Sequence, residues 1–129
     1  MRNVLVIAFV AFLCAGCTEG KRIDFIYFNL SKSEIVVDSI AGLPQWVAPG
    51  VLVPVHAEDR LSEARATAFD ETIQVPSTLR IKWQEGGVTR RADLKRDEVG
   101  IRAKIKKGTI RFTYLGSDRW RVKATEESQ

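Results

Sequence analysis

The residues of this chain that could carry out chemistry are few and scattered. His56 is the only histidine, and both cysteines lie near the start, at positions 14 and 17. A zinc site with several His or Cys ligands is therefore excluded after residue 17, because one imidazole cannot supply the ligands that zinc takes. We expect His56 to be a surface residue and not a catalytic base.

The acidic residues offer no better site. The carboxylate pairs within the domain are all adjacent in sequence: Glu58-Asp59, Asp70-Glu71 and Asp97-Glu98. Neighbours on a strand point to opposite faces, so adjacency does not build an acid/base couple. No Gly-x-Ser-x-Gly elbow, Asp-x-Asp-x-Asp loop or phosphate-cradling glycine motif occurs. The sequence therefore predicts no metal, no cofactor and no catalytic residue, and a hydrolase with an unrecognised site is the least favoured function.

Charge is distributed unevenly. Residues 17–79 hold five Lys or Arg against nine Asp or Glu, whereas residues 80–123 hold fourteen against five. In the basic half, cations alternate with apolar residues, and five of them are expected to share the face opposite the core: Arg80, Lys82, Arg111, Arg119 and Arg121. Three more extend this predicted basic sheet face: Arg102, Lys104 and Lys106.

Two interpretations of this face stay open. Such a patch could bind phosphates of lipid head groups, an anionic glycan or an acidic partner protein. It could equally be an ordinary solvated face, whose charges keep the protein soluble and protect the sheet edges.

The three tryptophans fall in different settings. Trp83 and Trp120 lie on the apolar phase of their strands and are expected in the core. Trp46 lies in a loop over residues 42–50 that contains two prolines and two glycines. A large aromatic there either packs over one end of the fold or is exposed for recognition.

These residues must be positioned by strands, because period-two alternation punctuated by Gly and Pro dominates from residue 22 onward. Residues 23–28 are apolar on both faces and suit a doubly covered strand, with 35–37 as its hairpin neighbour. Pro54 makes 51–55 an edge strand. Further strands are predicted at 64–69, at 79–84 and 88–94 around Gly86-Gly87, and at 101–106, 110–114 and 119–123. These seven to nine short strands predict an all-β fold: a small β-sandwich, immunoglobulin-like or transthyretin-like, or else a small β-barrel.

The N-terminal segment reads as an export signal. Arg2, an apolar run over 4–13 and small residues before Cys17 are the three parts of a secretory signal, and the run is too short to span a bilayer. Ala15-Gly16-Cys17 resembles the lipobox of bacterial lipoproteins, with Cys14 where Leu is commoner. The resemblance implies cleavage before Cys17, acylation of its thiol and a periplasm-facing protein, and Thr18 favours the outer membrane.

Together these observations divide the chain into a signal peptide (1–16), a lipidated tether (17–21), a β-sandwich domain (22–124) and a flexible acidic tail (125–129). We expect a non-catalytic binding or accessory module of the bacterial cell envelope. Its partners would be the membrane, through the lipid, and an envelope protein or anionic envelope component, but not nucleic acid. The alternative is a periplasmic inhibitor or immunity protein that caps an enzyme, with Trp46 as the plug.

Overall fold

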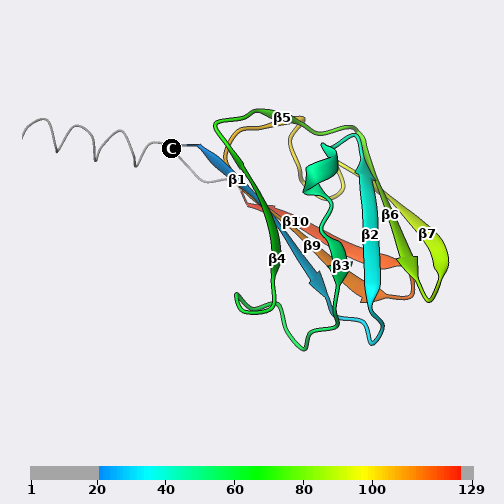
Figure 1. The fold of residues 1–129 in the computed structure, drawn as a ribbon. Coiled ribbons are helices and arrows are strands. Elements are labelled where there is room, and N and C mark those ends of the chain that lie inside the picture. Colours follow the sequence, from blue (N-terminus) through cyan, green and yellow to red (C-terminus); the bar gives the residue numbers. More distant parts are fainter. Residues whose placement is uncertain (1–20, 126–129) are drawn as a thin grey trace, which may run out of the picture.

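The computed structural model describes residues 21–125, so the predicted signal peptide, Cys17 and most of the predicted tether and tail lie outside the described residues. The described chain is all-β, with two four-stranded sheets, one two-stranded sheet and a short 3-10 helix, η1 (Gln45–Val47) (Figure 1). The predicted all-β sandwich is confirmed. The alternative of a barrel is wrong for this part of the chain, because each four-stranded sheet has two free edges.

We name the two large sheets after their central strands. The β1 sheet contains, in spatial order, β10 (Arg119–Thr125), β9 (Gly108–Gly116), β1 (Arg22–Asn29) and β4 (Ala64–Phe69). The β6 sheet contains β3 (Gly50–Leu52), β2 (Ile35–Ala41), β6 (Thr78–Glu85) and β7 (Val88–Lys95). The small sheet pairs β5 (Ile73–Gln74) with β8 (Lys104–Ile105).

The core lies between the two large sheets and follows from alternation along their strands. Leu79, Ile81 and Trp83 of β6 are fully buried, while the residues between them face solvent. Ile110, Phe112 and Tyr114 of β9 are buried against them from the other sheet. Period-two patterning is therefore enough to place these side chains.

The strand β1 is buried on both faces, as its continuous apolar run predicts. Ile23, Phe25 and Tyr27 belong to the core between the sheets, and Ile26 and Phe28 on the opposite face are buried as well. The strand runs antiparallel to β4 and parallel to β9. It therefore occupies the centre of its sheet.

Two expectations are wrong, one about the partner of a strand and one about the length of a strand. Residues 35–37 belong to β2, which pairs with β3 and β6 and not with β1. The buried Asn29 side chain explains the change of sheet, because its amide donates to the carbonyls of Ser33 (2.8 Å) and Leu52 (2.9 Å). Of the predicted strand 101–106, only β8 forms, since residues 96–103 turn with Gly100 at a positive φ of 73°.

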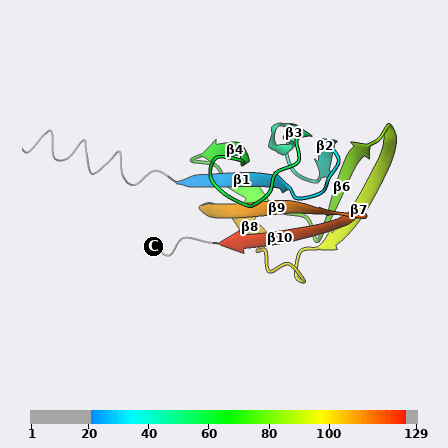
Figure 2. The same cartoon turned by 90° about the horizontal axis from the view of Figure 1, so that it is seen from below.

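The sandwich has two different poles. At the N-terminal pole β1 begins, β4 and β10 end, and η1 and the β5–β8 sheet cover the core (Figures 1 and 2). At the loop pole lie the connections 30–34 and 53–63 and the turns at 86–87 and 117–118. The start of β1 and the long connections 30–34 and 53–63 therefore lie at opposite ends of the sandwich.

Candidate functional site

The five cations of the predicted basic face do not form one surface. Arg80 and Lys82 lie on β6, whereas Arg111, Arg119 and Arg121 lie on β9 and β10 of the opposite sheet. The expectation of a shared face is therefore wrong, because the segment 96–107 carries the chain from one sheet to the other. Arg102, Lys104 and Lys106 lie in that segment, at the N-terminal pole, and extend neither face.

On the β6 sheet the outer face carries mixed charge. Arg80 lies opposite Asp93 of β7, and its Nε donates to that carboxylate at 2.9 Å. This hydrogen bond is the main reason why the pKa of Asp93 is lowered and that of Arg80 raised. Lys82 lies directly opposite Arg91, a like-charge pair that a sheet tolerates only at some cost in stability. Part of the predicted binding surface is thus already paired internally.

On the β1 sheet, Arg111 and Arg121 both bind the carboxylate of Glu58. The strand pattern could not predict this contact, because Glu58 lies in a loop. Glu58, from the loop 53–63, accepts hydrogen bonds from Thr113 Oγ1 (2.6 Å), from Arg111 Nη1 (3.3 Å) and from Arg121 Nη2. Its side chain is only 17% exposed. Arg111 and Arg121 therefore hold a loop of the chain itself.

The charge state of Glu58 follows from these contacts. Burial on its own would raise the pKa of this carboxyl, but the hydrogen bonds from Thr113 and Arg121 and the charges of Arg121 and Arg111 outweigh burial. The pKa is lowered below its ordinary value, so Glu58 is ionised at neutral pH. An ionised, fully hydrogen-bonded carboxylate is suited to anchoring a loop and poorly suited to proton transfer.

A second carboxylate, further along the same face, has the same surroundings. Asp24 of β1 is 8% exposed and accepts from Arg22 Nε (3.0 Å) and Thr67 Oγ1 (2.8 Å), with Arg65 Nη1 at 3.7 Å. Burial raises its pKa, but the hydrogen bonds from Arg22 and Thr67 and the charges of both arginines lower it overall. The outer face of the β1 sheet is therefore built from two arginine–threonine–carboxylate clusters.

The anchored loop is well defined beyond Glu58. The guanidinium carbon of Arg111, which binds Glu58, lies 5.9 Å from the centre of the buried Phe28 ring. Within the loop, Asp59 accepts hydrogen bonds from the backbone N–H groups of Leu61 and Ser62, both at 3.0 Å. These contacts hold the segment in one shape and leave Leu61 fully exposed (99%).

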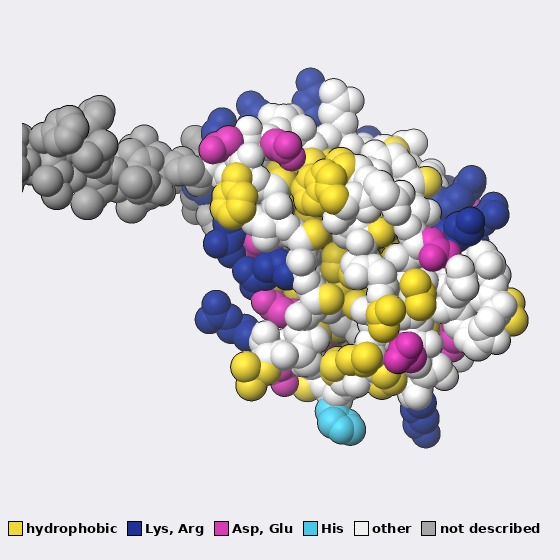
Figure 3. Space-filling view, viewed as in Figure 1, with side chains coloured by type: hydrophobic (Ala, Val, Ile, Leu, Met, Phe, Trp, Pro, Cys, Tyr) yellow, Lys and Arg dark blue, Asp and Glu magenta, His cyan; other side chains and the backbone are white. Residues whose placement is uncertain are grey.

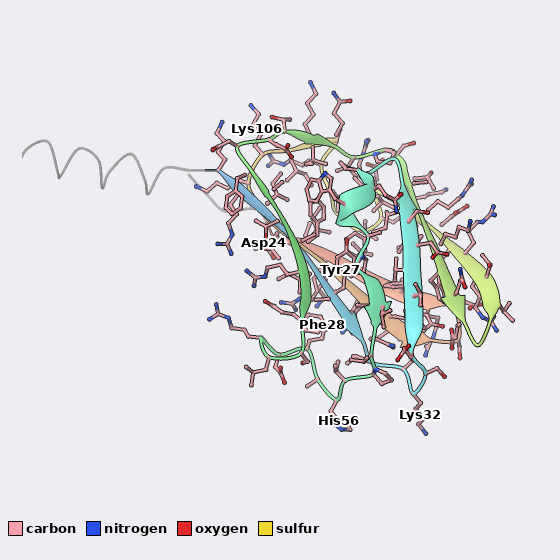
Figure 4. The ribbon with its side chains drawn as sticks, viewed as in Figure 1. Asp24, Tyr27, Phe28, Lys32, His56 and Lys106 are labelled. Atoms are coloured by element: carbon pink, nitrogen blue, oxygen red, sulfur yellow. The ribbon has the colours of Figure 1, made fainter. Side chains whose placement is uncertain are left out.

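An open pocket of about 430 Å³ lies at the loop pole, between the connections 30–34 and 53–63. Its lining is partly apolar and is formed by Leu30, Ser31, Lys32, Pro54, Val55 and His56. His56 and Lys32 point away from the sandwich into solvent (Figure 4). His56 is therefore a surface residue, as expected.

No family model matches this chain, and neither does any curated protein or solved structure. Within residues 21–125, no group of three or more His, Cys, Asp or Glu side chains is arranged to hold a metal ion. The same residues include no helix that is long and apolar enough to cross a bilayer.

Trp46 packs over one end of the fold and is also partly exposed. Its ring packs edge-on against Phe25, with centroids 6.1 Å apart, yet the residue is 46% exposed. Tyr27 holds the segment in place, because its buried hydroxyl donates to the carbonyl of Val47 at 2.5 Å. Trp83 and Trp120 are in the core, as predicted, and pack with Tyr114 in one aromatic cluster.

Sequence reasoning missed Glu58, Asp24 and the two threonines that bind them. Thr113 alternates with core residues of β9, which indicated an outward side chain but named no partner. Glu58 and Thr113 are 55 positions apart, so no local pattern connects them. Only the fold brings these residues together.

Proposed function

We propose that this protein is a lipid-anchored envelope lipoprotein that acts as a non-catalytic binding module and presents its loop pole to an envelope partner protein. The observation that carries the proposal is the polarity of the sandwich. The chain enters at one pole, while the anchored loop 53–63 and the pocket lie at the other.

Distances along the chain support this orientation. Residues 18–20 separate the proposed acylation site, Cys17, from Lys21, and the four residue steps between them span at most about 14 Å. The eight residues of β1 then cover roughly 26 Å towards the loop pole. A lipid on Cys17 would therefore hold the N-terminal pole against the membrane and leave the loop pole facing the periplasm.

The loop pole has properties of a recognition surface. Leu61 (99%) and Val53 (57%) expose large apolar side chains that folding alone does not require there. Because Glu58 fixes the loop to the β1 sheet, a partner would meet a surface that is already ordered and would lose little entropy on binding.

This orientation favours a binding module over an inhibitor that uses Trp46 as its plug. Trp46 lies at the N-terminal pole and would be close to the membrane rather than to a periplasmic enzyme. Because Thr18 follows the proposed acylation site, we propose the outer membrane as the location of the anchor. Nucleic acid is not an expected partner in that compartment.

Two measurements test the proposal. Mass spectrometry of the cellular protein should find an acylated Cys17 as the first residue, and an intact Met1 with an unmodified thiol would refute the anchor. A photo-crosslinking residue at Leu61 should capture a specific envelope protein, and Val53→Asp should abolish that capture without unfolding the domain. Capture from Lys82 but not from Leu61 would instead support the outer face of the β6 sheet.

A further inference from the structure

The N-terminal pole carries exposed aromatic residues that the binding function does not use. Phe69, the last residue of β4, is 65% exposed, and Trp46 is 46% exposed. Phe69 lies opposite Arg22 in the β1–β4 register, on the outer face of the β1 sheet, while Trp46 packs on Phe25 on the inner side. The two rings therefore flank the end of β4 at the pole where the chain enters.

Exposed cations lie at the same pole. Lys21 precedes β1, and Lys104 and Lys106 flank Ile105 of β8, with all three side chains directed to solvent. Arg22 pairs with Asp24 and contributes a partly exposed guanidinium. Figure 3 shows apolar side chains at this end of the molecule with Lys, Arg, Asp and Glu side chains beside them, and Figure 4 places Lys106 at the same end.

Acidic residues at this pole are fewer and partly engaged. Asp70 accepts a hydrogen bond from the backbone N–H of Lys21 at 3.2 Å, which ties the end of β4 to the start of β1. Across the described segments 21–24, 69–77 and 96–107, seven Lys and Arg face five Asp and Glu, and one of these acids is the Asp24 that pairs with Arg22. These described segments of the pole are therefore net basic.

We propose that the N-terminal pole rests directly on an anionic phospholipid surface, with Lys21, Lys104 and Lys106 on the head groups and Trp46 and Phe69 at the interface. The inference rests on the proposed acylation of Cys17, because the short segment 17–20 keeps this pole within about 14 Å of the bilayer. Cations attract anionic head groups within a Debye length, and aromatic rings favour the head-group level. The lipid chain would supply attachment, and this surface would set the orientation of the domain.

The test uses residues 17–129 with Cys17→Ser, which contain every described residue but carry no lipid. We expect co-sedimentation with vesicles of phosphatidylcholine mixed with phosphatidylglycerol, weakening as salt is raised, and little with phosphatidylcholine alone. Lys104→Glu with Lys106→Glu should lower the partition coefficient at least about tenfold. The matched control, Lys32→Glu with Lys82→Glu, changes the charge equally but away from the pole and should lower it much less.

An equal loss in both double variants would overturn the proposal, because net charge alone would then explain binding. Equal binding to both kinds of vesicle, or to neither, would overturn it as well. Mass spectrometry of Cys17 is independent of these results, so failure of this surface and failure of the anchor can be told apart.

A second measurement does not depend on the charge variants. Acylation would leave the mature chain without a free thiol, so Lys106→Cys or Lys32→Cys provides a single labelling site in the lipidated protein. On anionic vesicles, a fluorophore at position 106 should be quenched by lipid-borne quenchers, and one at position 32 should not. Equal quenching at both positions would refute the proposed orientation.

Discussion

The loop anchor at Glu58 is best tested by Glu58→Gln, which keeps the shape of the side chain and removes its charge. Thr113 can still donate to the amide oxygen, but Arg111 and Arg121 lose an anionic acceptor. Hydrogen bonds to charged groups contribute about 1.5–3 kcal/mol net. Both arginine side chains are more than 40% exposed, so solvent screens part of this contribution. We therefore expect the free energy of unfolding at pH 7 to fall by about 1–2 kcal/mol.

The loss should depend on pH in a defined direction. Burial alone would raise the pKa of Glu58, but Thr113, Arg121 and Arg111 bring it below the ordinary value of 4.5. A carboxyl whose pKa is lower in the folded chain stabilises the fold above its unfolded pKa, and this stabilisation disappears as the pH falls through the folded pKa. The difference between the wild type and the variant should be full above pH 4.5 and shrink progressively below it.

Urea denaturation followed by tryptophan fluorescence, at neutral and at acid pH, measures both effects. Asp93→Asn is the matched control, because it also neutralises an arginine-bound carboxylate, but one that is exposed on the β6 sheet. We expect little change in its free energy of unfolding. Equal losses for Glu58→Gln at both pH values, or no loss at neutral pH, would refute the assignment of Glu58 as a charged anchor.

Two further predictions concern packing. Gly42→Ala should lower the melting temperature more than Gly86→Ala: both glycines have positive φ, 92° and 59°, but only at Gly42 would a new Cβ meet Pro76 Cγ, at 2.4 Å. Comparable shifts in thermal unfolding would contradict this close approach. Trp83→Ala should cost about 3–5 kcal/mol in urea denaturation, because its ring is fully buried. Trp46→Ala should cost only about 1 kcal/mol, and a similar cost for both would show that Trp46 is structural.

The parts of the fold that could be predicted from the sequence depend on neighbouring residues. Alternation gave the inward side chains of β6 and β9, because period two is a property of each strand by itself. The hairpin β6–β7 followed from Gly86-Gly87, whose positive φ values a tight turn requires. The predicted range 64–69 coincides with β4.

What could not be predicted depends on contacts between distant segments. The buried Asn29 side chain directs β2 into the second sheet, and its partners lie in two segments: Ser31 and Ser33 in the connection 30–34, and Leu52 in the more distant strand β3. The expectation of one shared basic face failed for a similar reason. The pattern of each hairpin shows which residues point outward, but it does not show that the hairpins β6–β7 and β9–β10 lie in opposite sheets. Arg111 and Arg121 could be picked out from their strands, but their contact with Glu58 could not be predicted, because a loop residue has no periodicity.

The parallel pairing of β1 with β9 has a consequence for how the chain folds. Ile23 lies beside Gly108, so the first strand meets a central neighbour that is made 85 residues later. Contacts over such separations form slowly, and here they cannot form until nearly all of the chain is present. If the chain is exported N-terminus first, as proposed, β1 would therefore lack its central neighbour during most of the passage. The β1 sheet would be complete only once β9 and β10 have also crossed.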